Sequence, residues 1–470
     1  MQYVSTRGSA PAAGFAEVLL TGLAADGGLY VPAEWPKLPP ETIAGLVGRR
    51  YQDVAFEVTR VFVGDDIAEA DLRAMIEEAY AGFRHRAVTP VTQVAPNHYL
   101  AELFHGPTLA FKDVAMQLIA RLMDHVLNRR GRRTTIVCAT SGDTGGAAAE
   151  AFRGRDNADI FVLFPKGRVS PVQQRQMTTL GDANVHAIAV EGTFDDCQAL
   201  VKALFNNHGF RDRLQLSGVN SINWARVMAQ IVYYFTAALS LGAPARPVSF
   251  TVPTGNFGDI FAGYVAKRMG LPIRELVIAT NVNDILARTL ETGRYETGKV
   301  LPTSSPSMDI QVSSNFERLL FDAVGRDPEP VRSMMDRLKQ SGGFEVPGES
   351  LAAIRGEFAA GRADEDETAA TIAALFAESG YLLDPHTAVG VAVAERHMAE
   401  GVPMITLSTA HPAKFPDAVL AASGQAAPLP HWLGDLMQRE EHLIVRPNDI
   451  GEIERTIESR SRAALTAAGQ

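Results

Sequence analysis

Residues 104–113 read FHGPTLAFKD and place a single lysine, Lys112, behind an apolar run. From Asp113 onward, apolar residues such as Val114 and Leu118 recur at the spacing of one helix face. We therefore expect Lys112 at the start of a helix, where burial and the positive end of the helix dipole both disfavour an ammonium. A neutral amine can attack a carbonyl carbon, as a Schiff-base nucleophile must. The alternative is a structural lysine whose apolar stem packs on the protein while its head reaches solvent.

Around this stretch the chain alternates between short apolar runs and helical patterns, starting at about residue 97. This alternation predicts an α/β fold in which helices cover parallel sheets. In such sheets, ligands bind beyond the carboxyl ends of the strands. Residues 1 to about 90 read instead as a mainly helical N-terminal segment. The strand-like runs are 99–104, 134–139, 160–164, 185–190, 248–252, 276–279 and 404–407.

Length and charge indicate how many domains to expect and which kinds of partner to exclude. With 470 residues, the chain should form two or three domains with a substantial core. The formal net charge is −10 and no basic patch stands out, which argues against nucleic acid and anionic membrane surfaces as partners. No apolar run approaches the roughly 20 residues that a membrane helix needs.

The two cysteines, Cys138 and Cys197, show no metal-ligand spacing, so we expect no metal site. Few cysteines without a disulfide pattern indicate a reducing compartment, and the cytoplasm is the expected location. The first 14 residues, MQYVSTRGSAPAAG, lack the charged and apolar regions of a secretory signal.

Two glycine-rich turns stand where a strand is expected to meet a helix. They are TSGDTGG at 140–146 and TGNFGD at 254–259. Glycines allow close approach of the backbone to an anion, and free N–H groups at a helix start donate to it. Neither turn has the spacing of a P-loop or of the dinucleotide-binding fingerprint. Together they suggest two bound anions, although each turn alone is also compatible with an ordinary strand–helix connection.

A third stretch, LSTAHPAKF at 407–415, follows another buried strand. A hydroxyl there can hydrogen-bond a ring nitrogen, and Lys414 can help to neutralise an anionic substrate. The alternative is a solvated loop that has no role in binding.

These stretches also carry a resemblance that covers nearly the whole chain, from residue 3 to about 417. In order and spacing, ten motifs resemble the threonine synthase family, in the longer branch found in bacteria and fungi. The motifs are YVSTRG, DGGLYVP, FHGPTLAFKD, TSGDTG, GTFDDCQALV, NSINWAR, PTGNFGD, SPSMDIQVSSNFERLLF, DPHTAVG and STAHPAKF.

The resemblance implies an α/β fold of the fold-type II pyridoxal-phosphate class, similar to the tryptophan synthase β chain. It implies two domains that each contain a parallel sheet, plus the N-terminal segment. The implied divisions are an N-terminal segment 1–95, a catalytic core 96–425 with a large domain (about 96–115 and 245–425) and a small domain (about 116–244), and a C-terminal helical extension 426–470.

The implied activity is the last step of threonine biosynthesis. A carbon–oxygen lyase with pyridoxal 5′-phosphate would convert O-phospho-L-homoserine and water to L-threonine and phosphate. By motif position, Lys112 would hold the cofactor covalently and move protons, and Thr409 would meet the pyridine nitrogen. The cofactor phosphate would be bound by Gly255, Asn256, Phe257, Gly258 and Asp259. The substrate carboxylate would face Ser141, Asp143 and Thr144, and Lys414 and Arg226 are candidates for its phosphate.

Asp143 departs from the wider superfamily, in which many relatives have an asparagine that bonds the cofactor's 3′-oxygen. A carboxylate there would repel a phenolate, so Asp143 either points elsewhere or shares a proton with that oxygen.

Two other functions fit the same motifs. One is a phospho-lyase that forms 2-oxobutyrate from the same substrate, and the other is a non-catalytic binding protein. The expected assembly is a monomer or a homodimer.

Overall fold

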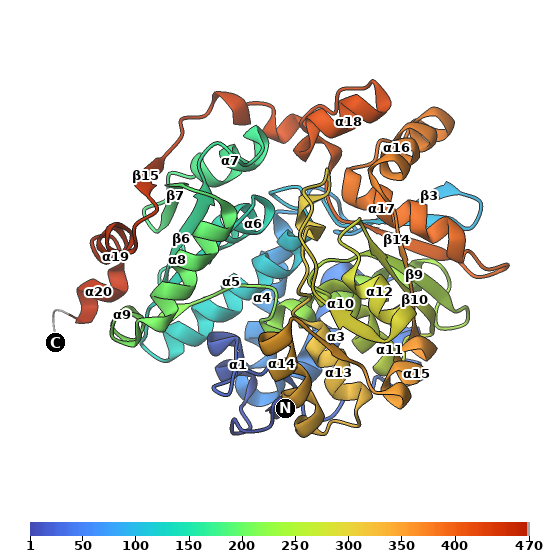
Figure 1. Ribbon diagram of the computed structural model, residues 1–470, viewed down its shortest axis with the longest axis horizontal. Helices are drawn as coiled ribbons and strands as arrows, with labels where there is room; N and C mark the ends of the chain where they lie inside the picture. The colour runs from blue at the N-terminus through green and yellow to red at the C-terminus, as the bar shows by residue number, and fades with distance from the viewer. Residues whose placement is uncertain (468–470) are drawn as a thin grey trace. The chain divides into compact units, whose positions relative to one another are not determined.

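Two parallel sheets organise the chain, one in each of two structural units (Figure 1). The structure is a computed structural model that describes residues 1–467. The predicted α/β fold with two parallel sheets is confirmed. Unit 1 comprises residues 1–18, 23–111 and 221–427, and unit 2 comprises residues 19–22, 112–220 and those from 428 onward.

The sheet of unit 2 has the order β15-β7-β6-β5-β8, and every neighbouring pair is parallel. All eight residues of β6 are buried, because helices cover both faces of the sheet. The strands are β5 (Thr134–Ala139), β6 (Ala158–Pro165), β7 (Val185–Glu191), β8 (Leu216–Ser217) and β15 (Leu443–Pro447).

Alternate residues of β6 point to opposite faces. Phe161 and Leu163 pack with residues of α8, α9 and α19 in one apolar cluster. Val162 points to the other face, where α6 lies against it at Gly145. The helices of unit 2 are α5 (Lys112–Arg129), α6 (Asp143–Phe152), α7 (Pro171–Thr178), α8 (Phe194–Asn206), α9 (His208–Leu214), α19 (Ile450–Glu458) and α20 (Arg462–Ala467).

The sheet of unit 1 has the order β13-β10-β9-β14-β4-β3. All pairs are parallel except β3 with β4, which form an antiparallel edge. The strands are β3 (Val91–Ala95), β4 (His98–Glu102), β9 (Val248–Pro253), β10 (Ile273–Thr280), β13 (Phe358–Arg362) and β14 (Met404–Ser408).

The central strands of unit 1 are covered on one side by α17, whose ten residues are all buried. Gly390 allows this close packing, because a Cβ there would lie 2.8 Å from a methyl group of Thr406 on β14. Tyr234 on α10 packs against Phe250 on β9, with ring centroids 4.8 Å apart. The remaining helices of unit 1 are α2 (Pro40–Gly45), α3 (Tyr51–Val63), α4 (Glu69–Ala81), α10 (Trp224–Ser240), α11 (Gly258–Arg268), α12 (Ile285–Thr292), α13 (Phe316–Ala323), α14 (Pro328–Ser341), α15 (Gly348–Glu357), α16 (Glu365–Ser379), α17 (Pro385–Ala394) and α18 (Pro416–Ser423).

The N-terminal segment packs on α10 through the fully buried Trp224. The indole lies 5.9 Å from the ring of Tyr3, 5.7 Å from Phe62 and 6.1 Å from Trp35, measured between centroids. These contacts make the segment, apart from residues 19–22, part of unit 1. It contains α1 (Phe15–Thr21), α2 to α4, and the antiparallel pair β1 (Tyr3–Ser5) and β2 (Tyr30–Pro32), while a second such pair, β11 (Arg294–Glu296) and β12 (Gly343–Glu345), lies later in the unit.

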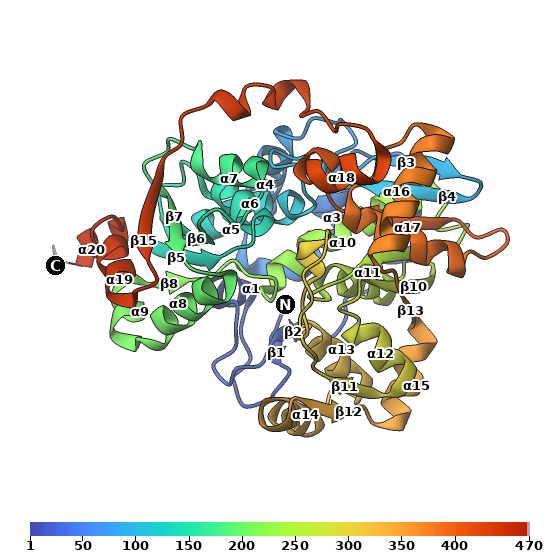
Figure 2. The same cartoon turned by 45° about the horizontal axis from the view of Figure 1, so that its top comes forward.

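The two units divide the chain at different places from the expected domains. The N-terminal segment and α10 belong to unit 1, because Trp224 and Tyr234 join them to its core. The expected helical extension from residue 426 instead contributes β15, which pairs with β7 at the edge of the unit 2 sheet (Figure 2). Residues 468–470 of that extension lie outside the described residues. Within residues 1–467, no helix combines the length and apolarity that crossing a bilayer requires.

The unit 2 core predicts a large stability difference between two isoleucines of α19. Ile453 is fully buried against α8 and α9, whereas Ile450 is 36% exposed. We expect Ile453→Ala to lower the free energy of unfolding by about 2–5 kcal/mol, because it leaves a cavity. Ile450→Ala should cost less than about 1 kcal/mol. Urea unfolding of both variants checks this, and equal small losses would show that α19 is not part of the core.

Candidate active site

Lys112 is the first residue of α5, as predicted, and is 7% exposed. Its Nζ lies 3.4 Å from Oδ2 of Asp143. Both residues belong to unit 2. Lys112 is therefore largely buried beside a carboxylate, unlike a lysine whose head extends into solvent.

Asp143 begins α6 and is held from its other side by Gln173 of α7. The Nε2 of Gln173 donates to Oδ1 of Asp143 at 2.9 Å. Gly142 lies beneath this amide with a φ of 140°, and any side chain at position 142 would collide with Gln173. One carboxylate oxygen therefore faces the lysine and the other faces the glutamine. Gln173 was not among the predicted site residues.

Two backbone N–H groups of the turn 140–146 are hydrogen-bonded within the turn itself. The Oγ1 of Thr140 accepts from the N–H groups of Gly142 and Gly145, each at 2.9 Å. These two donors are thus already used within the protein. Ser141 and Thr144 are half-buried on the same turn, and their proposed contact with a substrate carboxylate stays a prediction.

The second glycine-rich turn connects β9 to α11 in unit 1. Phe257 caps α11 with a φ of 63°, which non-glycine residues seldom adopt. Its ring is 1% exposed and lies 5.4 Å from the ring of Phe316, so aromatic packing holds this conformation. The N-cap side chain of this eleven-residue helix accepts no hydrogen bond from its first N–H groups. Such uncapped donors, at the positive end of the helix dipole, fit a phosphate.

The segment packed against this turn leaves little room for a side chain at Gly255 or Gly258. A Cβ at Gly255 would lie 2.8 Å from the carbonyl oxygen of Ser307, and one at Gly258 would lie 3.2 Å from Nδ2 of Asn315. A side chain at either position would therefore be limited by the segment 307–315 on this side of the turn before it could affect an anion on the other side.

The side chain of Asp259 turns toward α10. Its Oδ1 accepts from the hydroxyls of Tyr233 and Tyr234, and the Tyr234 hydroxyl also reaches the Asp259 carbonyl at 2.9 Å. Burial raises the pKa of Asp259 to about 7, although the tyrosines and the nearby positive charge of Arg226 oppose this rise. Burial also lowers the pKa of Arg226 to about 10. The charge of Arg226 thus lies near Asp259, deep in unit 1.

Within unit 1, the stretch that precedes Lys112 pairs through its backbone with the stretch around Thr409. Ala110 and Ala410, 300 residues apart, form an antiparallel bridge. The N–H of Phe111 donates to the carbonyl of Thr409 at 2.8 Å, and Lys112 follows Phe111 in the chain. Two stretches that were predicted separately therefore share one backbone arrangement.

The backbone of Thr409 is held by a hydrogen bond to α17. Its N–H donates at 3.2 Å to the hydroxyl of Thr387, which in turn donates to Asp384 at the start of α17. The nearby Lys414 is fully buried, and its Nζ donates to the carbonyl of Thr108 at 2.6 Å. This bond explains the burial of Lys414 without a substrate, so its role toward a substrate phosphate stays a prediction.

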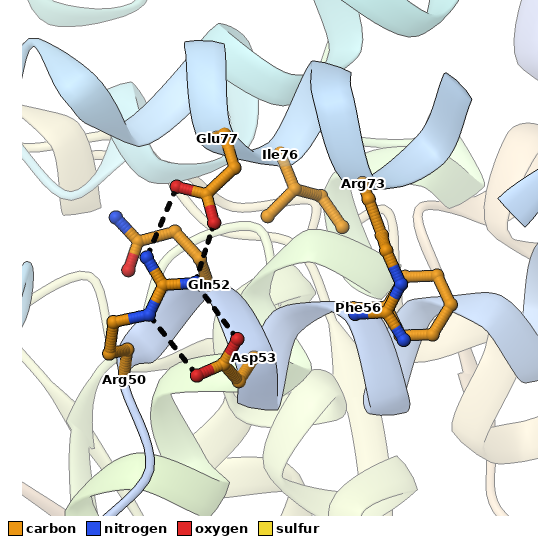
Figure 3. A pocket seen from close by; sticks show the side chains of 7 residues that line it. All are labelled: Arg50, Gln52, Asp53, Phe56, Arg73, Ile76 and Glu77. Carbon is orange, nitrogen blue, oxygen red and sulfur yellow. Dashed lines mark hydrogen bonds and ion pairs between the residues drawn. The ribbon is translucent and has the colours of Figure 1, made fainter. Parts of the chain in front are cut away.

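A small pocket lies between α3 and α4 and contains none of the predicted site residues (Figure 3). Its charges pair with one another: Arg50 bonds Asp53 at 3.0 Å and Glu77 at 2.7 Å. The guanidinium of Arg73 stacks over the ring of Phe56 at 3.3 Å. The pocket offers no arrangement for the predicted chemistry.

Comparison with known families assigns nearly every part of the chain. Residues 2–80 match the family model Threonine synthase N terminus, and residues 387–457 match Threonine synthase, C-terminal. Residues 85–362, more than half of the chain, match Pyridoxal-phosphate dependent enzyme.

Individual relatives agree with these matches. A threonine synthase of Pseudomonas aeruginosa is 55% identical over 97% of this chain and 97% of its own length. The crystal structure of a pyridoxal-phosphate-bound threonine synthase from Brucella melitensis is 64% identical, with a TM-score of 0.97 over 98% of this chain and all of that one. The yeast threonine synthase structure is 41% identical, with a TM-score of 0.93 over 98% of both chains.

The environment of Asp259 predicts a pH dependence of stability. Its pKa rises from about 3.9 in the unfolded chain to about 7 in the folded one, so folding favours the protonated form. This stabilisation is complete below pH 3.9 and is lost as the pH rises through 7, by up to about 4 kcal/mol. Asp259→Asn, which is neutral throughout, should lack this loss.

Urea unfolding between pH 5 and 8 checks this expectation. The stability of Asp259→Asn relative to the unsubstituted protein should increase with pH, while the exposed Asp195→Asn shows no such trend. A constant difference across the range would contradict the assignment.

Proposed function

The chain belongs to the threonine synthase family of pyridoxal-phosphate-dependent enzymes, and on this premise we propose how its residues act. The substrate would be O-phospho-L-homoserine, which with water gives L-threonine and phosphate. The observation that carries the proposal is the buried amine of Lys112 at the start of α5, 3.4 Å from Asp143. A largely buried lysine oriented by a carboxylate suits covalent attachment and proton transfer.

Pyridoxal phosphate, when bound, supplies the electron sink for the bonds that break near the substrate amine. Lys112 would hold the cofactor covalently until the substrate amine replaces it. Its freed Nζ would then take the proton from the substrate α carbon and later return it. Asp143, fixed by Gln173, would keep this Nζ oriented between the two steps.

The turn 254–257 and the uncapped start of α11 would bind the cofactor phosphate through N–H groups. Thr409 would offer the pyridine nitrogen a neutral hydroxyl, held in place through Thr387. Ser141 and Thr144 would bind the substrate carboxylate. Arg226, near Asp259, would lower the cost of placing a phosphate by this helix start.

We also propose a reducing, cytoplasmic location and a monomer or homodimer. Cys138 and Cys197 are both buried free thiols, which suits a compartment in which disulfides are rare.

Lys112→Ala is the test of the central residue. The purified variant with added pyridoxal phosphate should lack the visible absorption band of the lysine-bound cofactor. Threonine formation from O-phospho-L-homoserine should fall about a thousandfold or more. Lys166→Ala is the matched control, because Lys166 is exposed and pairs with Glu191.

The products decide between this function and the phospho-lyase alternative. Unsubstituted protein should release threonine and phosphate in equal amounts. Release of 2-oxobutyrate without threonine would refute the proposed reaction. A protein that takes up no pyridoxal phosphate would refute the enzymatic function itself.

A further inference from the structure

Backbone carbonyls of the turn between β9 and α11 accept hydrogen bonds from residues more than fifty positions later in the chain. The hydroxyl of Ser313 donates to the carbonyl of Gly255 at 2.7 Å. The backbone N–H and the Nδ2 of Asn315 both donate to the carbonyl of Asn256, at 3.1 and 3.0 Å. Two successive carbonyl groups of the turn therefore point toward the segment 313–315.

The directions of these carbonyls fix the directions of the neighbouring N–H groups. In a planar trans peptide, the C=O and N–H bonds point to opposite sides. Holding the carbonyls of Gly255 and Asn256 therefore turns the N–H groups of Asn256 and Phe257 away from the segment 313–315. The Cβ directions at Gly255 and Gly258, which point into segment 307–315, agree with a turn that is closed at the back.

The amide of Asn315 is oriented by a buried arginine. Nη1 of Arg318 donates to Oδ1 of Asn315, and since a guanidinium only donates, this bond sets which amide atom faces it. Nδ2 must then face the carbonyls of Asn256 and Ser221, the latter at 3.1 Å.

Arg318 is fully buried, and two further hydrogen bonds of its guanidinium are donated to backbone carbonyls. Its Nε donates to Tyr30 on β2 at 3.0 Å, and its Nη2 to Ile222 at 2.6 Å. The N-terminal segment is thus connected to the turn through two side chains, Arg318 and Asn315.

We propose that Ser313, Asn315 and Arg318 are positioning residues that aim the N–H groups of the turn 254–257 at the cofactor phosphate. The inference rests on the proposed function, which places the phosphate at this turn. None of the three side chains needs to touch the cofactor. By this arrangement, the N-terminal segment contributes to cofactor binding through β2.

The test compares two ligands that differ in the phosphate. Protein freed of cofactor is titrated with pyridoxal phosphate and, separately, with pyridoxal, and the visible absorption band reports binding. Ser313→Ala removes one donor without adding charge. Asn315→Asp keeps an acceptor for Arg318 but removes the Nδ2 donor. For both variants we expect the Kd for pyridoxal phosphate to rise about tenfold or more, while the Kd for pyridoxal changes less than about twofold.

Ser379→Ala is the matched control, because its hydroxyl also donates to a carbonyl, that of Leu375 at 2.8 Å, on a different helix. It should change neither Kd. A variant that has merely lost its fold would bind both ligands poorly, and that result would overturn the proposal. Unchanged affinity for pyridoxal phosphate in Ser313→Ala and Asn315→Asp would also overturn it.

The unsubstituted protein separates this inference from the proposed function. Suppose that the unsubstituted protein binds pyridoxal phosphate much more tightly than pyridoxal. If the variants keep the same ratio of the two Kd values, only the positioning role of Ser313 and Asn315 is refuted. If the unsubstituted protein binds both ligands equally, the turn is not a phosphate site, and the phosphate-binding part of the proposed function fails with the inference.

Discussion

The donors behind the turn between β9 and α11 are the constraint on which the candidate site depends. A planar peptide cannot turn its N–H groups toward an anion unless its carbonyls point the other way, and Ser313 and Asn315 supply the bonds that hold them there. Glycine alone would leave this turn with several conformations. The packing of Phe257 against Phe316 removes more of that freedom. The start of α11, the proposed phosphate site, is therefore shaped by two distant parts of the chain.

Much of the fold follows from the sequence, because strands buried on both faces read as continuous apolar runs. β6 is such a strand, and it was expected close to its observed limits. β13 and β15 were missed because they lie at sheet edges, where half-exposed residues interrupt the apolar pattern. The limits of the two units differ from those of the expected domains for another reason. Trp224 joins α10 to the N-terminal segment through contacts that no local pattern encodes.

The sequence could predict candidate site residues where they come directly after a strand. The turn after β9 and Thr409 lie at such positions, whereas Lys112 was found from the apolar pattern of the helix that it begins. The residues that orient them were not predicted, because their roles depend on contacts across long sequence separations. Gln173 reaches Asp143 across 30 residues, and Asn315 reaches Asn256 across 59. Arg318 lay within a quoted motif, but its sequence neighbours reveal nothing about the carbonyls that it binds. Sequence likewise shows that Lys414 carries a charge, but not that Thr108 accepts its bond.

The pairing of β15 with β7 also affects how the protein is made. Unit 2 is interrupted after residue 220, and β15 begins about 220 residues further along the chain. β15 begins about 250 residues after the end of β7, so at roughly 5–20 residues per second β7 has no outer partner for roughly 13–50 s during synthesis. An unpaired strand edge is a template for pairing with other chains. Until synthesis reaches β15, the edge of β7 therefore has unpaired backbone groups that another chain could bind.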